Sequence, residues 1–235
     1  MLITIVILSV GHCPALPPPS TTSATSREAL QAFNILIGSW KGTGSPEGVS
    51  REQRAAGFWT ETIVWNWHFK NDSSWLSATF HKGKHFTQGE LRWLPEKSHY
   101  QLVLTAPDKS TRTFTGTLKA KLLTLDRTDP PAGESQRFVI NMLHSNRFLY
   151  WLESRPAGST LGYHKTYQVG ATKEGVPFAN APKGPECIVS GGLGTIKVMY
   201  KGQEYRVCCS GCREEFLASP EKYILEAERK AKAKK

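Results

Sequence analysis

The sequence predicts a mainly β protein in two parts: an antiparallel barrel of eight to ten strands, then a small α+β module built around cysteines. Three observations lead to this fold class. Hydrophobic residues alternate with a period of two between Gly38 and Val169, in short runs separated by turn residues. Four of the five cysteines fall within residues 187–212. Between these segments, residues 170–185 hold three Pro and three Gly, which is the composition of a linker.

Composition and charge narrow the possible functions. The 235 residues are 39% hydrophobic and 21% charged, with seven Trp, as in an ordinary globular protein. The formal net charge is +10, but the basic tail, residues 227–235, contributes five Lys or Arg against one Glu. Because so much of the charge is local, we expect a solvated helix end there and no specific nucleic-acid partner.

Residues 1–26 have the outline of a signal peptide and a spacer. The first ten residues form an apolar run too short to cross a bilayer as a helix, and Pro14 to Ser26 is rich in Pro, Ser and Thr. No Lys or Arg precedes the apolar run, so a mis-set start codon is the alternative. We expect export, to the periplasm or the exterior, and no transmembrane segment in the mature protein.

Residues 27–169 are predicted to form the barrel. Ser26 is the predicted N-cap of a short helix, Arg27 to Ile37, whose apolar residues repeat at helical spacing. The strands begin at Gly38, and closing them into a barrel hides the edges that an open sheet would expose. One face of the longest strand collects large apolar side chains: Trp59, Ile63, Trp65, Trp67 and Phe69.

The first predicted strand carries a motif, Gly38-Ser-Trp40-Lys-Gly42-Thr-Gly44. It resembles the Gly-x-Trp signature of lipocalin-like (calycin) barrels, and its extended form is similar to that of nitrobindin-like barrels. The resemblance implies that Trp40 plugs the closed end, that the glycines let the strand bend, and that the barrel could hold a small apolar ligand. Nitrobindin-like barrels hold haem through a late-strand His, here His164. It alternates out of phase with the apolar residues Leu161, Tyr163, Tyr167 and Val169, so we expect it to face water and expect no haem.

Residues 186–226 are predicted to form the cysteine module. Alternating residues and the tight turn Lys201-Gly202 predict a β-hairpin that ends at Cys208. Cys212 then lies in the first turn of a helix, and a second helix begins at Pro220 after the N-cap Ser219. This order brings thiols from before the hairpin, from its end and from the helix start to one point, where the helix N-terminus favours thiolates.

Thiolates clustered in this way suit a soft or borderline metal such as Zn or Cu(I). The spacing Cys187-x20-Cys208-x3-Cys212 resembles the YHS/TRASH family of treble-clef-like metal modules. Tyr200-Lys-Gly-Gln-Glu-Tyr205 is similar to the family's Tyr-x-Gly-x-x-Tyr hairpin, and Phe216…Pro220-Glu-Lys-Tyr223 to its closing Phe…Pro-x-x-Tyr. The resemblance implies a metal site whose ligands are Cys187, Cys208 and Cys212.

One departure from the family concerns the fourth ligand position. Many members carry Cys three residues after the first Cys, where this chain has Ser190. The fourth ligand would then be Cys209, a water or a group of a partner. A disulfide framework is the alternative, because export would remove Cys13 and leave four thiols in an oxidising compartment, with Cys187 bridged to one of the others. A degenerate module with neither metal nor bridge is the third possibility.

These observations favour a non-enzymatic, exported protein that senses, buffers or delivers a heavy metal. The alternative is a small-ligand carrier that uses the barrel, with a merely structural cysteine module. A basic nucleic-acid adaptor is a third candidate. No Ser/His/Asp arrangement, phosphate-binding Gly loop or paired carboxylates indicate an enzyme, and Cys-x3-Cys is not the Cys-x-x-Cys of thiol oxidoreductases.

Overall fold

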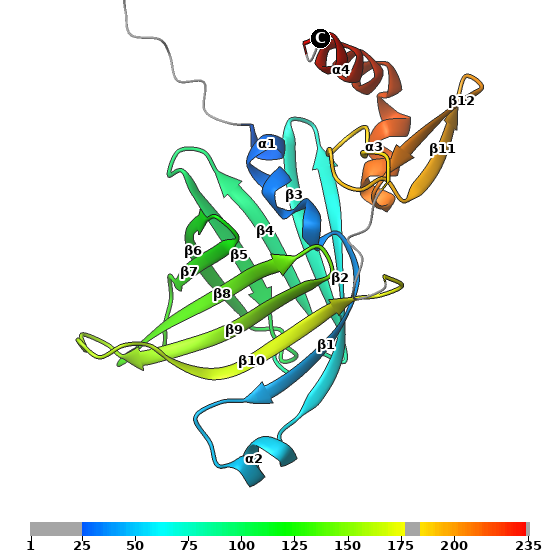
Figure 1. Ribbon diagram of the computed structural model, residues 1–235. Coiled ribbons are helices and arrows are strands. Elements are labelled where there is room, and N and C mark those ends of the chain that lie inside the picture. Colours follow the sequence, from blue (N-terminus) through cyan, green and yellow to red (C-terminus); the bar gives the residue numbers. More distant parts are fainter. Residues whose placement is uncertain (1–24, 177–183, 234–235) are drawn as a thin grey trace, which may run out of the picture.

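The computed structural model describes residues 25–176 and 184–233. Ten antiparallel strands form a closed barrel, in which β1 pairs with both β2 and β10 (Figure 1). The predicted fold class is therefore confirmed, at the upper end of the expected strand number. The strands are β1 (Gly38–Pro46), β2 (Trp59–Lys70), β3 (Ser73–His81), β4 (Gln88–Leu94), β5 (His99–Thr105), β6 (Thr111–Lys119), β7 (Leu122–Arg127), β8 (Glu134–His144), β9 (Arg147–Pro156) and β10 (His164–Lys173).

A short helical segment precedes the barrel. It consists of α1 (Ser26–Leu30) and the 3₁₀-helix η1 (Gln31–Leu36), so the prediction of one helix from Arg27 to Ile37 was wrong in form. Ser26 was also wrong as the N-cap. Thr25 caps α1, because its side chain accepts from the Glu28 N–H while the Glu28 carboxylate accepts from the Thr25 N–H. Figure 1 shows α1 at one end of the barrel and α2 (Arg51–Ala56) at the other.

The end of the barrel beside α1 is closed by side chains. Leu30, Phe33 and Leu36 are fully buried. The Trp40 indole lies beneath them, donating from Nε1 to the Leu36 carbonyl at 2.6 Å and packing edge-on against Phe148 with ring centroids 4.8 Å apart. This is the plug that the Gly-x-Trp motif implied, and it is stabilised by apolar burial and by the hydrogen bond of the indole N–H.

The two later glycines of the motif are required by close packing. A Cβ atom on Gly44 would lie 2.2 Å from the Trp59 ring, and one on Gly42 would lie 3.0 Å from Cγ of Glu61. The glycines therefore make room for two side chains of β2. Glu61 is only 3% exposed inside the barrel, where it accepts hydrogen bonds from Nε1 of Trp59 and the hydroxyl of Tyr150.

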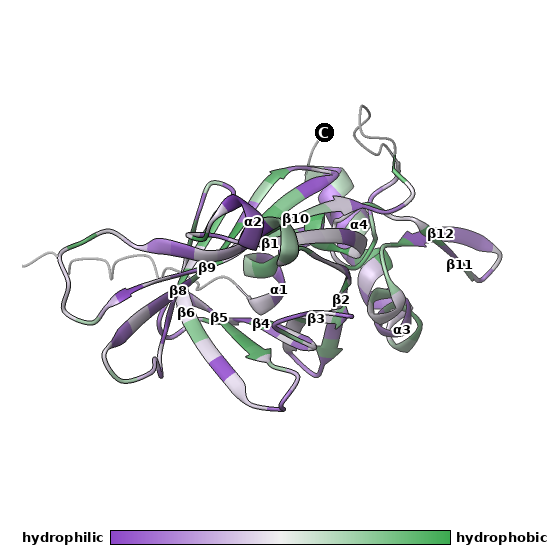
Figure 2. Ribbon diagram, turned by 90° about the horizontal axis from the view of Figure 1, so that it is seen from below, coloured by the Kyte–Doolittle hydropathy of each residue, from purple (hydrophilic) through white to green (hydrophobic). Residues whose placement is uncertain are grey.

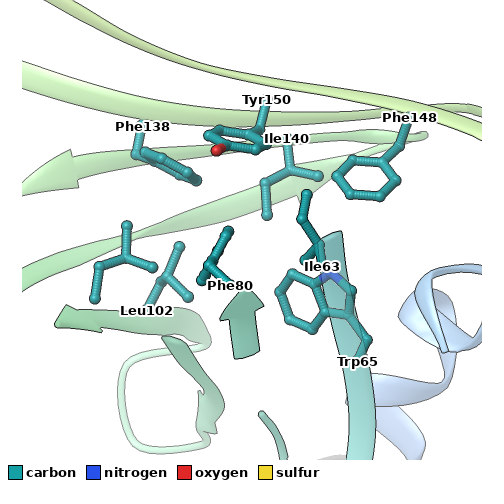
Figure 3. A pocket seen from close by; sticks show the side chains of 9 residues that line it. Ile63, Trp65, Phe80, Leu102, Phe138, Ile140, Phe148 and Tyr150 are labelled. Carbon is teal, nitrogen blue, oxygen red and sulfur yellow. The ribbon is translucent and has the colours of Figure 1, made fainter. Parts of the chain in front are cut away.

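Apolar side chains fill the middle of the barrel. Figure 3 shows them converging from opposite walls on a cavity of about 10 Å³, room for about one water molecule. A drug-sized ligand needs several hundred Å³, so a carrier function would require these side chains to move. The lining residues are Ile63, Trp65, Phe80, Leu102, Leu104, Phe138, Ile140, Phe148 and Tyr150.

Strand β10 corrects two details of the sequence-based prediction. His164 is exposed as expected, but Leu161, which precedes the strand and was expected on the inward-facing apolar side, is also exposed, at 70%. The strand also continues to Lys173, four residues into the predicted linker 170–185. Residues 177–183 of that linker, and residues 1–24 of the predicted signal peptide and spacer, lie outside the described residues.

The loop between β3 and β4 gives a pH-dependent prediction. The His85 ring stacks on Tyr167 with centroids 3.9 Å apart, and burial, with smaller contributions from the charges of Lys84 and Arg112, lowers the pKa of His85 from 6.5 to about 4. The unfolded chain therefore binds the proton more readily than the folded protein does. As the pH falls from about 6.5 to about 4, this difference lowers the free energy of unfolding. We expect His85→Gln to flatten the fall in Tm over this range, and identical profiles for the variant and the parent would contradict the prediction.

The cysteine module follows the barrel. It contains the hairpin of β11 (Ile196–Tyr200) and β12 (Gln203–Val207) and the helices α3 (Ser210–Ala218) and α4 (Pro220–Ala233). Helix α4 thus continues through most of the basic tail, whose described residues 227–233 are exposed. Figures 1 and 2 both place α3 beside β2. Figure 2 also shows hydrophilic and hydrophobic residues alternating along the strands. None of the described helices has the length and apolar character needed to span a membrane.

Candidate metal centre

The hairpin brings the end of β12 to the centre of the module. Its two turn residues, Lys201 and Gly202, both have positive φ, 47° and 78°, which is the type I′ geometry that matches the twist of a two-residue hairpin. The strands pair from Ile196 opposite Val207 to Tyr200 opposite Gln203. Cys208 follows directly after β12, as predicted.

A tight loop holds Cys187 against the end of this hairpin. The Cys187 N–H donates to the Gly192 carbonyl at 2.6 Å, and the Cys187 carbonyl accepts from the Gly191 N–H at 2.8 Å. Gly191 adopts φ 74°, which favours glycine. The next residue, Ile188, donates its N–H to the carbonyl of Arg206 on β12 at 2.9 Å, so the loop is attached to the strand that ends at Cys208.

Helix α3 contributes the third thiol. Cys212 is its third residue and is fully buried, in the first helical turn where it was predicted. Cys209 is the N-cap residue, with extended backbone (φ −157°), and its carbonyl accepts from the Arg213 N–H. Cys209 and Cys212 therefore both lie at the N-terminus of α3, whose partial positive charge stabilises negative charge on sulfur.

The Sγ atoms of Cys187, Cys208 and Cys212 all lie within 4.8 Å of one another, and the three residues are buried. The Sγ atoms of Cys208 and Cys212 are 3.5 Å apart. All four described cysteines are free thiols. The structure therefore brings together the three predicted ligands, from three different elements.

This geometry fits a thiolate-bound metal. Tetrahedral Zn²⁺ with Zn–S bonds of about 2.3 Å places neighbouring sulfurs about 3.8 Å apart. The observed separations, 3.5 Å between Cys208 and Cys212 and at most 4.8 Å within the group, require thiol shifts of about an ångström or less. The three thiols could hold Zn²⁺ or Cu(I), since both accept sulfur donors.

The pKa values of the four thiols are shifted in opposite directions. Hydrogen bonds from the neighbouring thiols of Cys208 and Cys212 lower the pKa of Cys187 to about 2 and that of Cys209 to about 3. The same contacts, first with Cys187, raise the pKa of Cys208 and of Cys212, because a proton there is held by a neighbouring thiolate. A metal ion at this centre would have to displace the protons of Cys208 and Cys212, since thiols bind metal as thiolates.

Two residues lie close to the three thiols where a fourth metal ligand could come from, Ser190 and Cys209. Ser190 is fully buried, with Oγ 3.4 Å from Sγ of Cys208 and its N–H donating to Sγ of Cys187 at 3.5 Å. Cys209 lies beside the group of three, with Sγ 3.9 Å from Sγ of Cys208. Its Sγ accepts a hydrogen bond from the backbone N–H of Trp67 at 3.4 Å. Ligation by Cys209 stays a prediction.

Residues near the end of the barrel also lie around the centre, and nothing in the sequence predicted them. The Asn34 amide donates to the Ser190 carbonyl at 2.8 Å and accepts from the Trp67 indole at 3.0 Å. Lys173, at the end of β10, donates to the Ile35 carbonyl at 3.3 Å. Burial lowers the pKa of Lys173.

No family model matches the chain, and no curated protein matches it. Among solved structures, the chain is similar to one titled "Crystal Structure of Rv2717c from M. tuberculosis", with 19% sequence identity and a TM-score of 0.39. That match covers 62% of this chain and 97% of the other.

Proposed function

We propose that this protein is a non-enzymatic metal-binding protein that senses, buffers or delivers Zn²⁺ or Cu(I) through Cys187, Cys208 and Cys212. The observation that carries the proposal is the meeting of three buried thiols from a loop, a hairpin end and a helix start within 4.8 Å. A metal ion that is bound by thiols from three separate segments stabilises the folded arrangement of those segments, because the site does not exist in the unfolded chain.

The chemistry of the donors supports a soft or borderline ion. Thiolate sulfur selects Zn²⁺ and Cu(I) over Mg²⁺ and Ca²⁺, which prefer oxygen. Burial of all three thiols supports holding the ion rather than using it in catalysis, because a catalytic site keeps a coordination position open to water or substrate. Export of the chain, proposed from its first residues, would give the site a role outside the cytoplasm.

The test is a metal analysis of the full chain, purified without chelator. We expect about one equivalent of Zn or Cu, and a metal-bound protein whose Tm falls when a chelator removes the ion, since a bound ion stabilises only the folded state. A count of free thiols in denaturant with chelator should recover every cysteine in reduced form. Protein without metal and without free thiols in residues 187–212 would replace the proposal by a disulfide-linked module.

A further inference from the structure

The barrel and the module share an interface built around the thiol centre. A Cβ atom on Gly211 of α3 would lie only 1.7 Å from the carbonyl oxygen of Trp67, so helix and strand are in backbone contact. At the periphery, the Arg27 guanidinium pairs with Glu226 at 2.7 Å and donates to the carbonyl of Val189 at 3.4 Å. The module therefore contacts the barrel or its preceding helix at two places, at Gly211 and at Arg27.

Two hydrogen-bonded chains run from the barrel to the thiols. In the first, the Asn34 amide donates to the carbonyl of Ser190. The backbone N–H of Ser190 in turn donates to Sγ of Cys187 at 3.5 Å. In the second, the backbone N–H of Trp67 holds Sγ of Cys209, the residue next to Cys208 in sequence and 3.9 Å from it in space. The Trp67 indole joins the two chains by donating to Asn34 at 3.0 Å.

We propose that Asn34 and Trp67 are positioning residues of the thiol centre, so that the barrel sets its metal affinity and a bound ion in turn tightens the module on the barrel. This inference rests on the proposed function. Residues that orient ligands from behind change metal affinity about 10- to 100-fold when they are removed. The coupling must be reciprocal, because a contact that strengthens binding is itself strengthened when the ion binds.

The barrel is suited to this role because it is rigid where the module is small. Asn34 lies in η1, and Trp67 is fully buried in β2, where it pairs with Leu76 of β3. A module of about forty residues has little apolar core of its own to fix three thiols. Ligands held in the binding geometry beforehand lose less conformational entropy when the ion binds, which raises affinity.

The test uses full-length variants and Zn²⁺ in competition with a chromophoric chelator. We expect Asn34→Ala to weaken Zn²⁺ binding about 10-fold or more. Asn34→Asp keeps an acceptor for the Trp67 indole but loses the donor to Ser190, and it should weaken binding at least as much. Asn66→Ala is the matched control, because Asn66 precedes Trp67 on β2 and faces the other side of the sheet, and it should bind as the parent does.

A second readout separates positioning from mere support of the fold. Zn²⁺ should change the tryptophan emission of the parent, and this change should be absent in Trp67→Phe, although six other tryptophans remain. If Asn34→Ala lowers the Tm but binds one equivalent with parental affinity, the residue is structural and the inference is overturned. If the parent itself binds no metal, the proposed function fails instead, so the two failures are distinguishable.

Discussion

Replacing Cys208 or Cys212 by serine is expected to abolish stoichiometric metal binding and the stability that the ion contributes. Each thiol is one of three that meet within 4.8 Å, and both are buried, so no water replaces a lost ligand easily. A serine hydroxyl stays protonated at neutral pH and is a poor donor for a soft ion. Structural Zn²⁺ sites in small modules bind with about 10 to 16 kcal/mol, so losing one ligand removes several kcal/mol.

The measurements are metal content after gel filtration and the Tm with and without chelator. In the parent the chelator should lower the Tm, whereas in Cys208→Ser and Cys212→Ser it should change nothing. Cys209→Ser is the informative comparison, because Cys209 contacts both Cys208 and the barrel. Retention of one tightly bound equivalent makes the site a three-thiol centre, and loss makes Cys209 the fourth ligand. One equivalent retained in both Cys208→Ser and Cys212→Ser would rule out the proposed centre.

Much of the fold was predictable because it depends on local patterns. A period of two with regular turns is enough to predict an antiparallel meander, and the hairpin Ile196–Val207 follows from its alternation and its Lys-Gly turn. Details that depend on tertiary packing were missed. Glu61 occupies an inward position on β2, but alternation alone gives no reason for an acid inside a barrel; its partners, Trp59 and Tyr150, are known only from the closed structure.

The thiol set was predictable for a related reason. Cys208 and Cys212 are close in sequence and lie at the junction of a predicted hairpin and a predicted helix, so their meeting needs little tertiary information. The barrel's part in the centre was not predictable. Asn34 and Ser190 are separated by 156 positions, and nothing in either local sequence indicates the contact. The proline- and glycine-rich linker at residues 170–185 instead predicted that the barrel and the cysteine module would be independent of each other.

At Gly211, where α3 of the module contacts β2 of the barrel, a single added methyl group is expected to disrupt the interface. At Gly211, a Cβ atom would lie 1.7 Å from the carbonyl oxygen and 2.8 Å from the carbonyl carbon of Trp67. Both atoms belong to the backbone of a paired strand, which cannot rotate away as a side chain can. Helix propensity alone favours Ala over Gly by about 1 kcal/mol. Overpacking a rigid contact costs about 1 to 3 kcal/mol or more, and the clash therefore wins.

We expect Gly211→Ala to lower stability and Gly211→Val to lower it further, with α3 displaced from β2 and the contacts from Trp67 to Cys209 and from Asn34 to Ser190 broken. For a chain of this length each kcal/mol corresponds to about 2 to 4 °C in Tm. Ser210→Ala is the matched control, because Ser210 is the preceding, exposed residue of α3, and it should leave the Tm almost unchanged. Limited proteolysis should release the module from Gly211→Val while the barrel resists. A Gly211→Ala protein as stable as the parent would show that the helix does not rest on the strand, and a module that still held its metal would then do so without the barrel.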